Sequence, residues 1–309
     1  MGLFVLLPLV LPVTAWPIAR LAEQHLHPRR ATWLLTGVGA VLALCSTLCV
    51  ALIAVVGTAA VPGNPLPDSW SDPEVRAAVP FDDVMGRASI PALVAVACAV
   101  VFTLWRHRRV RREAERALAG LPASSVAVLP DEAPYAYALP GGRGRVVVST
   151  AMLACLTGRE RRALFAHERA HLAHRHHRFL LVAQLAARAH PFLRPLRTAV
   201  AYGAERWADE EAAQLVGDRR LMARAVGRAA LVGAATPTPT FAALAAPGPV
   251  PRRVAALLGP VPPAAGWPPA YTPAGLAAWI AAGGAAVSAL SSLNAAVALT
   301  VILRAALAA

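Results

Sequence analysis

The stretch His167-Glu168-Arg169-Ala170-His171 lies in a run of helix-forming residues and decides how we interpret this chain. Residues four apart on a helix share one face, so the imidazoles of His167 and His171 can bind the same metal ion. The carboxylate of Glu168 lies beside them and can accept a proton from an attacking water molecule. We therefore predict His167 and His171 as Zn²⁺ ligands and Glu168 as the catalytic base. The alternative is a histidine-rich polar helix face that binds nothing.

A catalytic zinc ion usually has three protein ligands and one open position, so a third ligand is needed. His177 follows His167 by ten residues, but no glycine turn separates them, and an unbroken helix would place it about 15 Å along the axis. Glu205 is the better candidate, because the segment around it also has helical composition. Asp209 lies four residues further on the same face and can accept a hydrogen bond from a ligand histidine. A solvated acidic helix is the alternative for both carboxylates.

The two motifs together, H-E-R-A-H and E-R-W-A-D, resemble the gluzincin membrane proteases, whose second motif is E-x-x-x-D. Two related groups are similar: the HtpX and CAAX-protease family, and the BlaR/MecR-type antirepressor metallopeptidases. The segments 135–140 and 145–150, with a glycine turn between them, resemble the two strands that precede the active helix in both groups. The resemblance covers about residues 120–220. It implies an α+β zincin-like domain that cleaves peptide bonds in a protein or peptide substrate.

The second of these predicted strands contains Val146, Val147 and Val148. In proteases of this type, an exposed edge strand beside the zinc helix can bind substrate by adding a peptide strand. The three valines are therefore candidates for a substrate-binding edge, and an ordinary interior strand is an equally good interpretation.

The composition indicates a membrane protein, since 57% of the residues are hydrophobic and the mean hydropathy is +0.52. A bilayer core requires about 20 apolar residues of helix. The apolar runs cover about residues 3–18, 32–61, 90–105 and 274–304. The first run has no basic start, which favours a retained anchor over a cleaved signal peptide. The predicted fold is thus mainly α, with four transmembrane helices and the cytosolic α+β domain inserted between the third and the fourth.

The distribution of arginine between the apolar runs predicts the orientation in the cell membrane. The chain has no Lys, so all 30 residues of the Lys and Arg type are Arg. Residues 20–30 and 106–116 are basic, whereas most of the charged side chains in residues 62–89 are acidic. We expect an external amino terminus, an external loop over 62–89 and a cytosolic zinc metallopeptidase domain over 106–235. Residues 236–273 are dense in Pro, Gly and Ala and are expected to form a linker to the last span.

Local signals also predict where the active helix begins and ends. Thr157 and Glu160 have the spacing of a capping box, so the helix is expected to begin near Gly158. It can continue to residue 189, before Pro191. On this long helix, His176 is expected to lie at the surface or to serve packing.

The formal net charge is +13, and residues 106–272 contain 24 Arg against 11 Asp and Glu. Beside a lipid bilayer, anionic lipid of the inner leaflet is the simplest partner for this charge. The sequence contains no recognisable nucleic-acid-binding motif, so we expect no direct nucleic-acid partner.

The BlaR/MecR-type proteins share the plan of three spans, a cytosolic zinc domain and a fourth span. They then carry an external penicillin-binding sensor, whereas only about six residues follow Leu303 here, so beta-lactam sensing is not expected. The resemblance implies regulatory cleavage of a repressor-like protein, such as a winged-helix repressor. HtpX-like quality control of membrane proteins and a catalytically silent membrane signalling protein are the alternatives.

Overall fold

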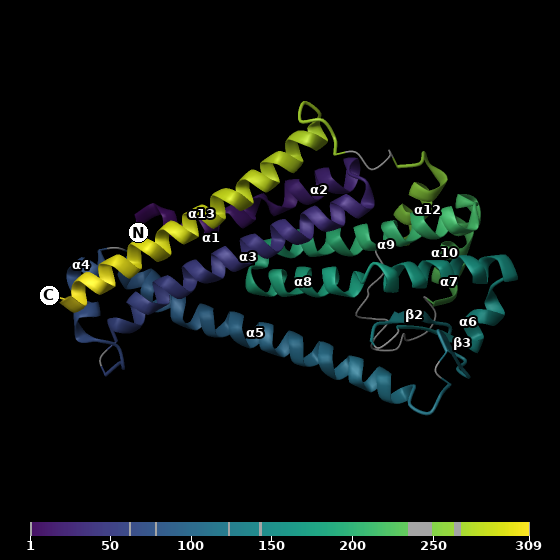
Figure 1. The fold of residues 1–309 in the computed structure, drawn as a ribbon, viewed down its shortest axis with the longest axis horizontal. Helices are drawn as coiled ribbons and strands as arrows, with labels where there is room; N and C mark the ends of the chain where they lie inside the picture. Colours follow the sequence, from purple (N-terminus) through teal and green to yellow (C-terminus); the bar gives the residue numbers. More distant parts are fainter. Residues whose placement is uncertain are drawn as a thin grey trace.

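The computed structural model is elongated and mainly helical, with one small sheet near one end (Figure 1). It describes residues 2–61, 63–77, 79–122, 124–141, 144–233, 249–262 and 267–308. The longer helices are α2 (Ala15–His25), α3 (Pro28–Ala59), α5 (Asp82–Ala117), α7 (Gly158–Ala173), α8 (His176–Ala189), α9 (Arg194–Val216), α10 (Arg219–Gly233), α12 (Val250–Leu258) and α13 (Pro273–Ala308). The short helical pieces are η1 (Gly2–Val5), α1 (Leu7–Val10), η2 (Leu11–Thr14), η3 (Asp68–Ser71), α4 (Pro73–Arg76), α6 (Thr150–Cys155) and η4 (Pro191–Leu193).

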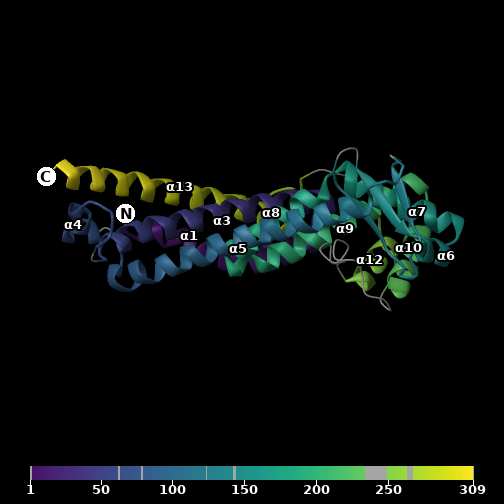
Figure 2. The same cartoon turned by 90° about the horizontal axis from the view of Figure 1, so that it is seen from below.

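Helices α3, α5 and α13 are long and apolar enough to cross a membrane, which suggests a membrane protein. They run along one another in the half of the molecule that carries both termini (Figures 1 and 2). Gly57 of α3 and Gly86 of α5 touch, and a Cβ atom added at Gly57 would collide with the backbone of Gly86. Helix α5 begins at Asp82, inside the loop predicted over 62–89, and the remainder of that loop contains η3 and α4.

The first predicted span, over 3–18, is wrong as a single helix. The chain instead forms η1, α1, η2 and α2 in succession. Pro8, Pro12 and Pro17 each lack the backbone N–H that an uninterrupted α-helix requires, which accounts for the short pieces. The segment still lies beside α3 and α13, because Val5 is buried in one cluster with side chains of both helices.

The sheet consists of β1 (Val126–Leu129), β2 (Ala136–Leu139) and β3 (Arg145–Ser149), in the order β1-β3-β2. Strand β3 pairs with β1 in parallel and with β2 in antiparallel fashion. The interpretation of Val146, Val147 and Val148 as an edge is therefore wrong, and all three are at most 1% exposed. Their side chains are apolar on both faces of the strand, as expected for a strand that is covered on both sides. Strand β2 is an edge of this sheet and packs against α7.

Helix α7 begins with the predicted capping box, in which the side chains of Thr157 and Glu160 each accept a hydrogen bond from the other residue's backbone N–H. Its predicted continuation to residue 189 is wrong. The chain leaves the helix at Arg175, which has a left-handed φ of 53°, and α8 begins at His176. This break changes the direction of every side chain that follows it.

Helices α8 and α9 form a hairpin that lies along α3 (Figure 1). A Cβ atom added at Gly39 of α3 would lie 3.4 Å from Leu196 and 3.9 Å from Ala186, so the two arms of the hairpin meet α3 at the same height. Further along, Gly203 of α9 packs on Thr32, where the missing side chain permits a close approach. The hairpin thereby fixes the position of the second motif relative to the apolar helices.

The linker predicted over 236–273 is wrong in part, because α12 lies within it. Val250, Val254 and Leu257 share one helix face, which packs on α10 beside Met222. Residues 236–248 and 263–266 of the predicted linker lie outside the described residues, as do Gly142 and Arg143 of the predicted glycine turn.

Candidate metal centre

The first motif lies on α7 and the second on α9, and these two helices pack side by side. The Nε2 atoms of His167 and His171 are 3.1 Å apart. The carboxylate of Glu205 faces both, with oxygens 3.6 Å from His167 Nε2 and 3.3 Å from His171 Nε2. One ligand atom from each of the three residues lies within 4.8 Å of the others, so the group could hold a metal ion.

The other ring nitrogen of His167 faces Asp209. His167 Nδ1 lies 3.1 Å from Asp209 Oδ1, and Asp209 is completely buried. The contact is close enough for an ion pair, although the ring is not aligned for a hydrogen bond. Asp209 therefore lies at the ring nitrogen of His167 that does not face Glu205.

His176 belongs to this group, and the sequence analysis assigned it only a surface or packing role. Its Nδ1 lies 2.8 Å from Nδ1 of His171, and its side chain is fully buried against Trp207. Residues five apart on one straight helix point about 140° apart, so this contact depends on the break at Arg175. The run of histidines after the motif was the only signal for it in the sequence.

Arg253 is the second residue that the sequence analysis missed. It reaches the site from α12, where its Nη1 lies 2.7 Å from Glu205 Oε2. Its Nε and Nη2 donate hydrogen bonds to the two oxygens of Asp209, at 2.8 and 2.6 Å. The side chain of Arg253 is 5% exposed. The apolar spacing around it could have indicated a helix, but no local pattern indicates an ion pair with a residue 44 positions away.

The two histidines of the motif have opposite electrostatic environments. Burial alone would lower the pKa of His167, but Asp209 and Glu205 outweigh it and raise this pKa to about 10. For His171 burial dominates and lowers the pKa to about 4. Burial opposes the charged form of Glu205, but Arg253 and the two histidines hold its pKa below the ordinary value. Of the two motif histidines, His167 is therefore the one that is protonated at neutral pH when no metal is bound.

Glu168 lies beside the group and is 8% exposed. Burial raises its pKa to about 7, and a backbone hydrogen bond from Ala138 of β2 acts in the opposite direction. A carboxyl group with a pKa near neutrality can take up and release protons at physiological pH. The same hydrogen bond ties this carboxylate to the edge strand of the sheet.

The residues fit a zinc-type ion, because two imidazole nitrogens and one carboxylate are a usual donor set for it. Glu205 Oε2 is shared with Arg253, whereas Oε1 faces His171. The far nitrogens of both histidines face buried polar side chains, which is the usual arrangement behind metal-bound histidine.

A mainly helical fold with such a group between two packed helices is consistent with a zincin-type metallopeptidase. Residues 103–194 match the model of peptidase family M48, which supports this class. The matched segment includes His167, Glu168 and His171 and ends before Glu205. No curated protein and no solved structure matches the chain.

Proposed function

We propose that the chain is an integral membrane zinc metalloendopeptidase that hydrolyses peptide bonds of protein substrates at the cytosolic face of the membrane. The observation that carries this proposal is the convergence of His167, His171 and Glu205 on one point, with Glu168 beside them. The match to peptidase family M48 over residues 103–194 supports it.

In this proposal His167, His171 and Glu205 hold the zinc ion. The ion supplies Lewis-acid polarisation of the peptide carbonyl and of the attacking water when it is bound. Glu168 accepts the proton of the attacking water and then donates a proton to the leaving amine. Its pKa of about 7 suits both steps, because neither protonation state is strongly favoured at neutral pH.

Asp209, His176 and Arg253 act through the ligands. Asp209 lies behind His167, and His176 lies behind His171, so both rings keep Nε2 directed at the metal position. Arg253 compensates the charge of two buried carboxylates, Asp209 and Glu205. The three residues thus keep the ligand set in place.

We also propose that the substrate binds along β2, because the candidate strand with Val146, Val147 and Val148 is the central strand of the sheet. A peptide that pairs with an edge strand gains main-chain hydrogen bonds with little demand on its sequence. Strand β2 has such an edge, packs against α7, and contains Ala138, whose backbone reaches Glu168. A peptide paired there would run past the proposed base.

The proposed topology keeps the four membrane-crossing segments and the external amino terminus of the sequence analysis. The amino-terminal η1 and the acidic segment with α4 lie at the same end of the molecule, where Val5 and Val75 share one buried cluster (Figure 1). The arginine-rich end of α5 lies towards the peptidase part. Both observations support a cytosolic metal site under the positive-inside rule.

For the physiological role we propose regulatory cleavage of a repressor-like protein. A neighbouring gene for a small winged-helix repressor, and loss of that repressor only when Glu168 is intact, would support this role. Cleavage of damaged membrane proteins, with no such repressor, would identify quality control instead. A silent signalling protein has no chemical use for a carboxyl group buried beside the metal group, as Glu168 is.

The experiment compares detergent-purified wild type, Glu168→Gln and the matched control Glu132→Gln, whose side chain is exposed. We expect wild type and control to cleave casein or the chain itself, and Glu168→Gln to lose at least about 100-fold in rate while keeping its zinc. Equal rates for all three proteins would remove Glu168 from the mechanism. Absence of zinc-dependent cleavage in the wild type would overturn the proposed enzyme.

A further inference from the structure

The turn between α8 and α9, residues 188–197, is called the hairpin tip here. Its Phe192 is 57% exposed, although it is a large apolar side chain. Arg188, Arg194 and Arg197 flank it in the sequence and are exposed as well. Within the described residues, none of these three guanidinium groups has an ion-pair or hydrogen-bond partner. Neither the core of the protein nor the metal centre accounts for this combination.

Helix geometry gives the height of the tip along the apolar helices. Helices α3 and α5 touch at Gly57 and Gly86. From this contact Gly39 lies 18 residues back along α3, and Trp105 lies 19 residues forward along α5. At 1.5 Å per residue these distances are about 27 and 28 Å, so Gly39 and Trp105 are at one level. The separation is close to the thickness of a bilayer core, about 30 Å.

The hairpin tip lies at this same level. A Cβ atom added at Gly39 would meet Ala186, two residues before the tip, and Leu196, within it. The amino-terminal segment supports this placement, because η2 contacts η4 within the tip. The exposed phenylalanine and its three arginines therefore lie where the apolar part of the helices ends.

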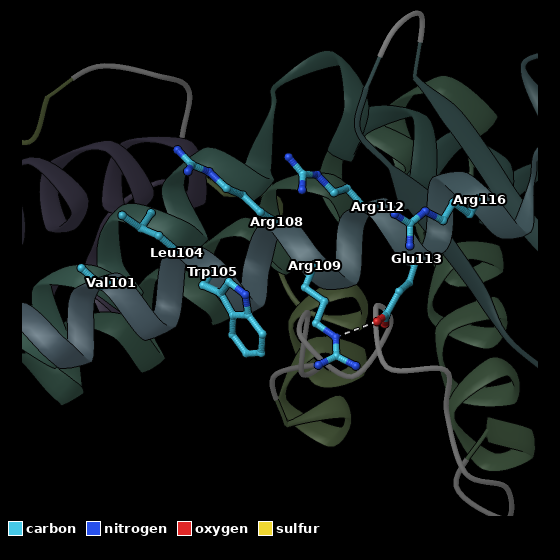
Figure 3. Close-up of a pocket in the computed structure, with 8 residues that line it drawn as sticks. All are labelled: Val101, Leu104, Trp105, Arg108, Arg109, Arg112, Glu113 and Arg116. Atoms are coloured by element: carbon cyan, nitrogen blue, oxygen red, sulfur yellow. Dashed lines mark hydrogen bonds and ion pairs between the residues drawn. The ribbon is translucent and has the colours of Figure 1, made fainter.

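On two other helices, a tryptophan at this level is followed by an arginine one turn later. On α5, Trp105 stacks against Arg109, and the groove in Figure 3 continues from it along a row of arginines. On α2, shortly after η2, Trp16 stacks against Arg20. Tryptophan followed by arginine is typical of the cytosolic boundary of a bilayer.

We propose that the hairpin tip docks on the inner surface of the membrane and binds the headgroups of anionic phospholipids. Phe192 enters the boundary of the acyl chains, and Arg188, Arg194 and Arg197 bind lipid phosphates. The three unpartnered positive charges select anionic lipid, and the exposed phenylalanine selects a bilayer over free phosphate. The inference rests on the proposed membrane location and is independent of the proposed peptidase activity.

The docked tip would set the height of the metal centre above the lipid. Gly203, two residues before Glu205, packs on Thr32, which lies seven residues along α3 from Gly39. This places the centre roughly 10 Å beyond the level of the tip. A substrate segment that emerges from the membrane would meet the centre within a few residues.

The experiment measures lipid retention on the detergent-purified full chain by native mass spectrometry, with phosphatidylglycerol or phosphatidylcholine added. The tip variant carries Arg188→Gln, Arg194→Gln and Arg197→Gln. The control variant makes the same change of charge at exposed arginines of α7 and α10, with Arg162→Gln, Arg220→Gln and Arg224→Gln. We expect wild type and control to prefer phosphatidylglycerol and the tip variant to lose about fivefold in affinity for each arginine that binds a headgroup.

A tip variant with lysine at all three positions keeps the charge and should keep the preference. Circular dichroism verifies the helix content of each protein, and the three single Gln variants replace the triple variant if it fails to fold. Phe192→Ser should weaken retention of both lipids, because it removes the apolar contact. The proposal is overturned if the tip and control variants retain phosphatidylglycerol equally, or if inorganic phosphate displaces the lipid at millimolar concentration. Casein cleavage by the same proteins reports separately on the proposed peptidase.

Discussion

Arg253 donates two parallel hydrogen bonds to Asp209, from Nε to Oδ2 at 2.8 Å and from Nη2 to Oδ1 at 2.6 Å. Both side chains are buried, and the same guanidinium also contacts Glu205. The pair joins α12 to α9 and links the last helix of the peptidase part to both carboxylates of the second motif. A buried pair of this kind costs desolvation, and its removal from one side leaves an uncompensated charge.

Arg253→Met should therefore destabilise the metal-free protein by about 3–5 kcal/mol, because Asp209 and Glu205 lose their buried cation. Added zinc should recover more stability in this variant than in the wild type. Thermal unfolding with and without zinc is the measurement. Arg252→Met is the matched control, since the Arg252 side chain is half-exposed where it contacts Glu23, and loss of this ion pair should cost under about 1 kcal/mol. Equal effects of the two substitutions would contradict the proposed role of Arg253.

Zinc binding should release about one proton per ion at pH 8. The pKa of His167 is raised to about 10, so its ring is protonated in the metal-free protein and must lose that proton to bind. The pKa of His171 is lowered to about 4, so this ring contributes none. Zinc affinity should consequently rise about tenfold per pH unit from pH 7.5 to 9.

Calorimetry in buffers of different ionisation enthalpy counts the released protons. Glu168→Gln provides the control, because it removes a buried group beside the site whose pKa is raised to about 7. A count near zero at pH 8 would show that His167 is neutral before the metal binds.

His176→Phe should lower zinc affinity by about 10- to 100-fold, because the ring of His171 loses the partner at its Nδ1. His176→Asn restores a polar side chain at this position and should recover part of the loss. A competition titration with a chromophoric chelator measures the affinity. His177→Phe serves as the comparison and should leave affinity unchanged, since the charged or titratable neighbours of His177 are His107 and arginines, and none of them belongs to the metal group.

Glu205→Ala should abolish stoichiometric zinc binding, whereas Glu211→Ala should not. Both glutamates lie on α9, but only Glu205 faces the two motif histidines, while Glu211 contacts His174. Metal analysis of the two purified variants beside wild type gives the answer. Full zinc occupancy in Glu205→Ala would mean that another residue supplies the third ligand.

Local spacing predicted the elements on which the site is built. Two histidines four apart on a helix must share a face, and their Nε2 atoms are 3.1 Å apart. The Thr157 and Glu160 pair marked the start of α7 for the same kind of reason, because a capping box involves only the first turn of a helix. Predictions of how far an element continues failed. The first apolar segment forms several short helices instead of one, and the active helix ends at Ala173.

The order of the strands could not be derived from the chain. An apolar strand such as Val146 to Val148 is compatible with a central or an edge position, and only its two partners decide between them. The break at Arg175 is equally hidden, because a single left-handed residue needs no glycine. That one residue brings His176 to His171.

The sequence by itself determined the start of α7, the face that His167 and His171 share, and the long apolar helices, because each depends on contacts within a few turns of one element. The tertiary structure alone decided that β2 is the edge beside the motif, that His176 and Arg253 join the site, and that the hairpin tip lies level with Trp105. These features depend on residues brought together from distant parts of the chain by packing. The free energy of such contacts depends on the shape of the whole molecule, and no short pattern of residues records it.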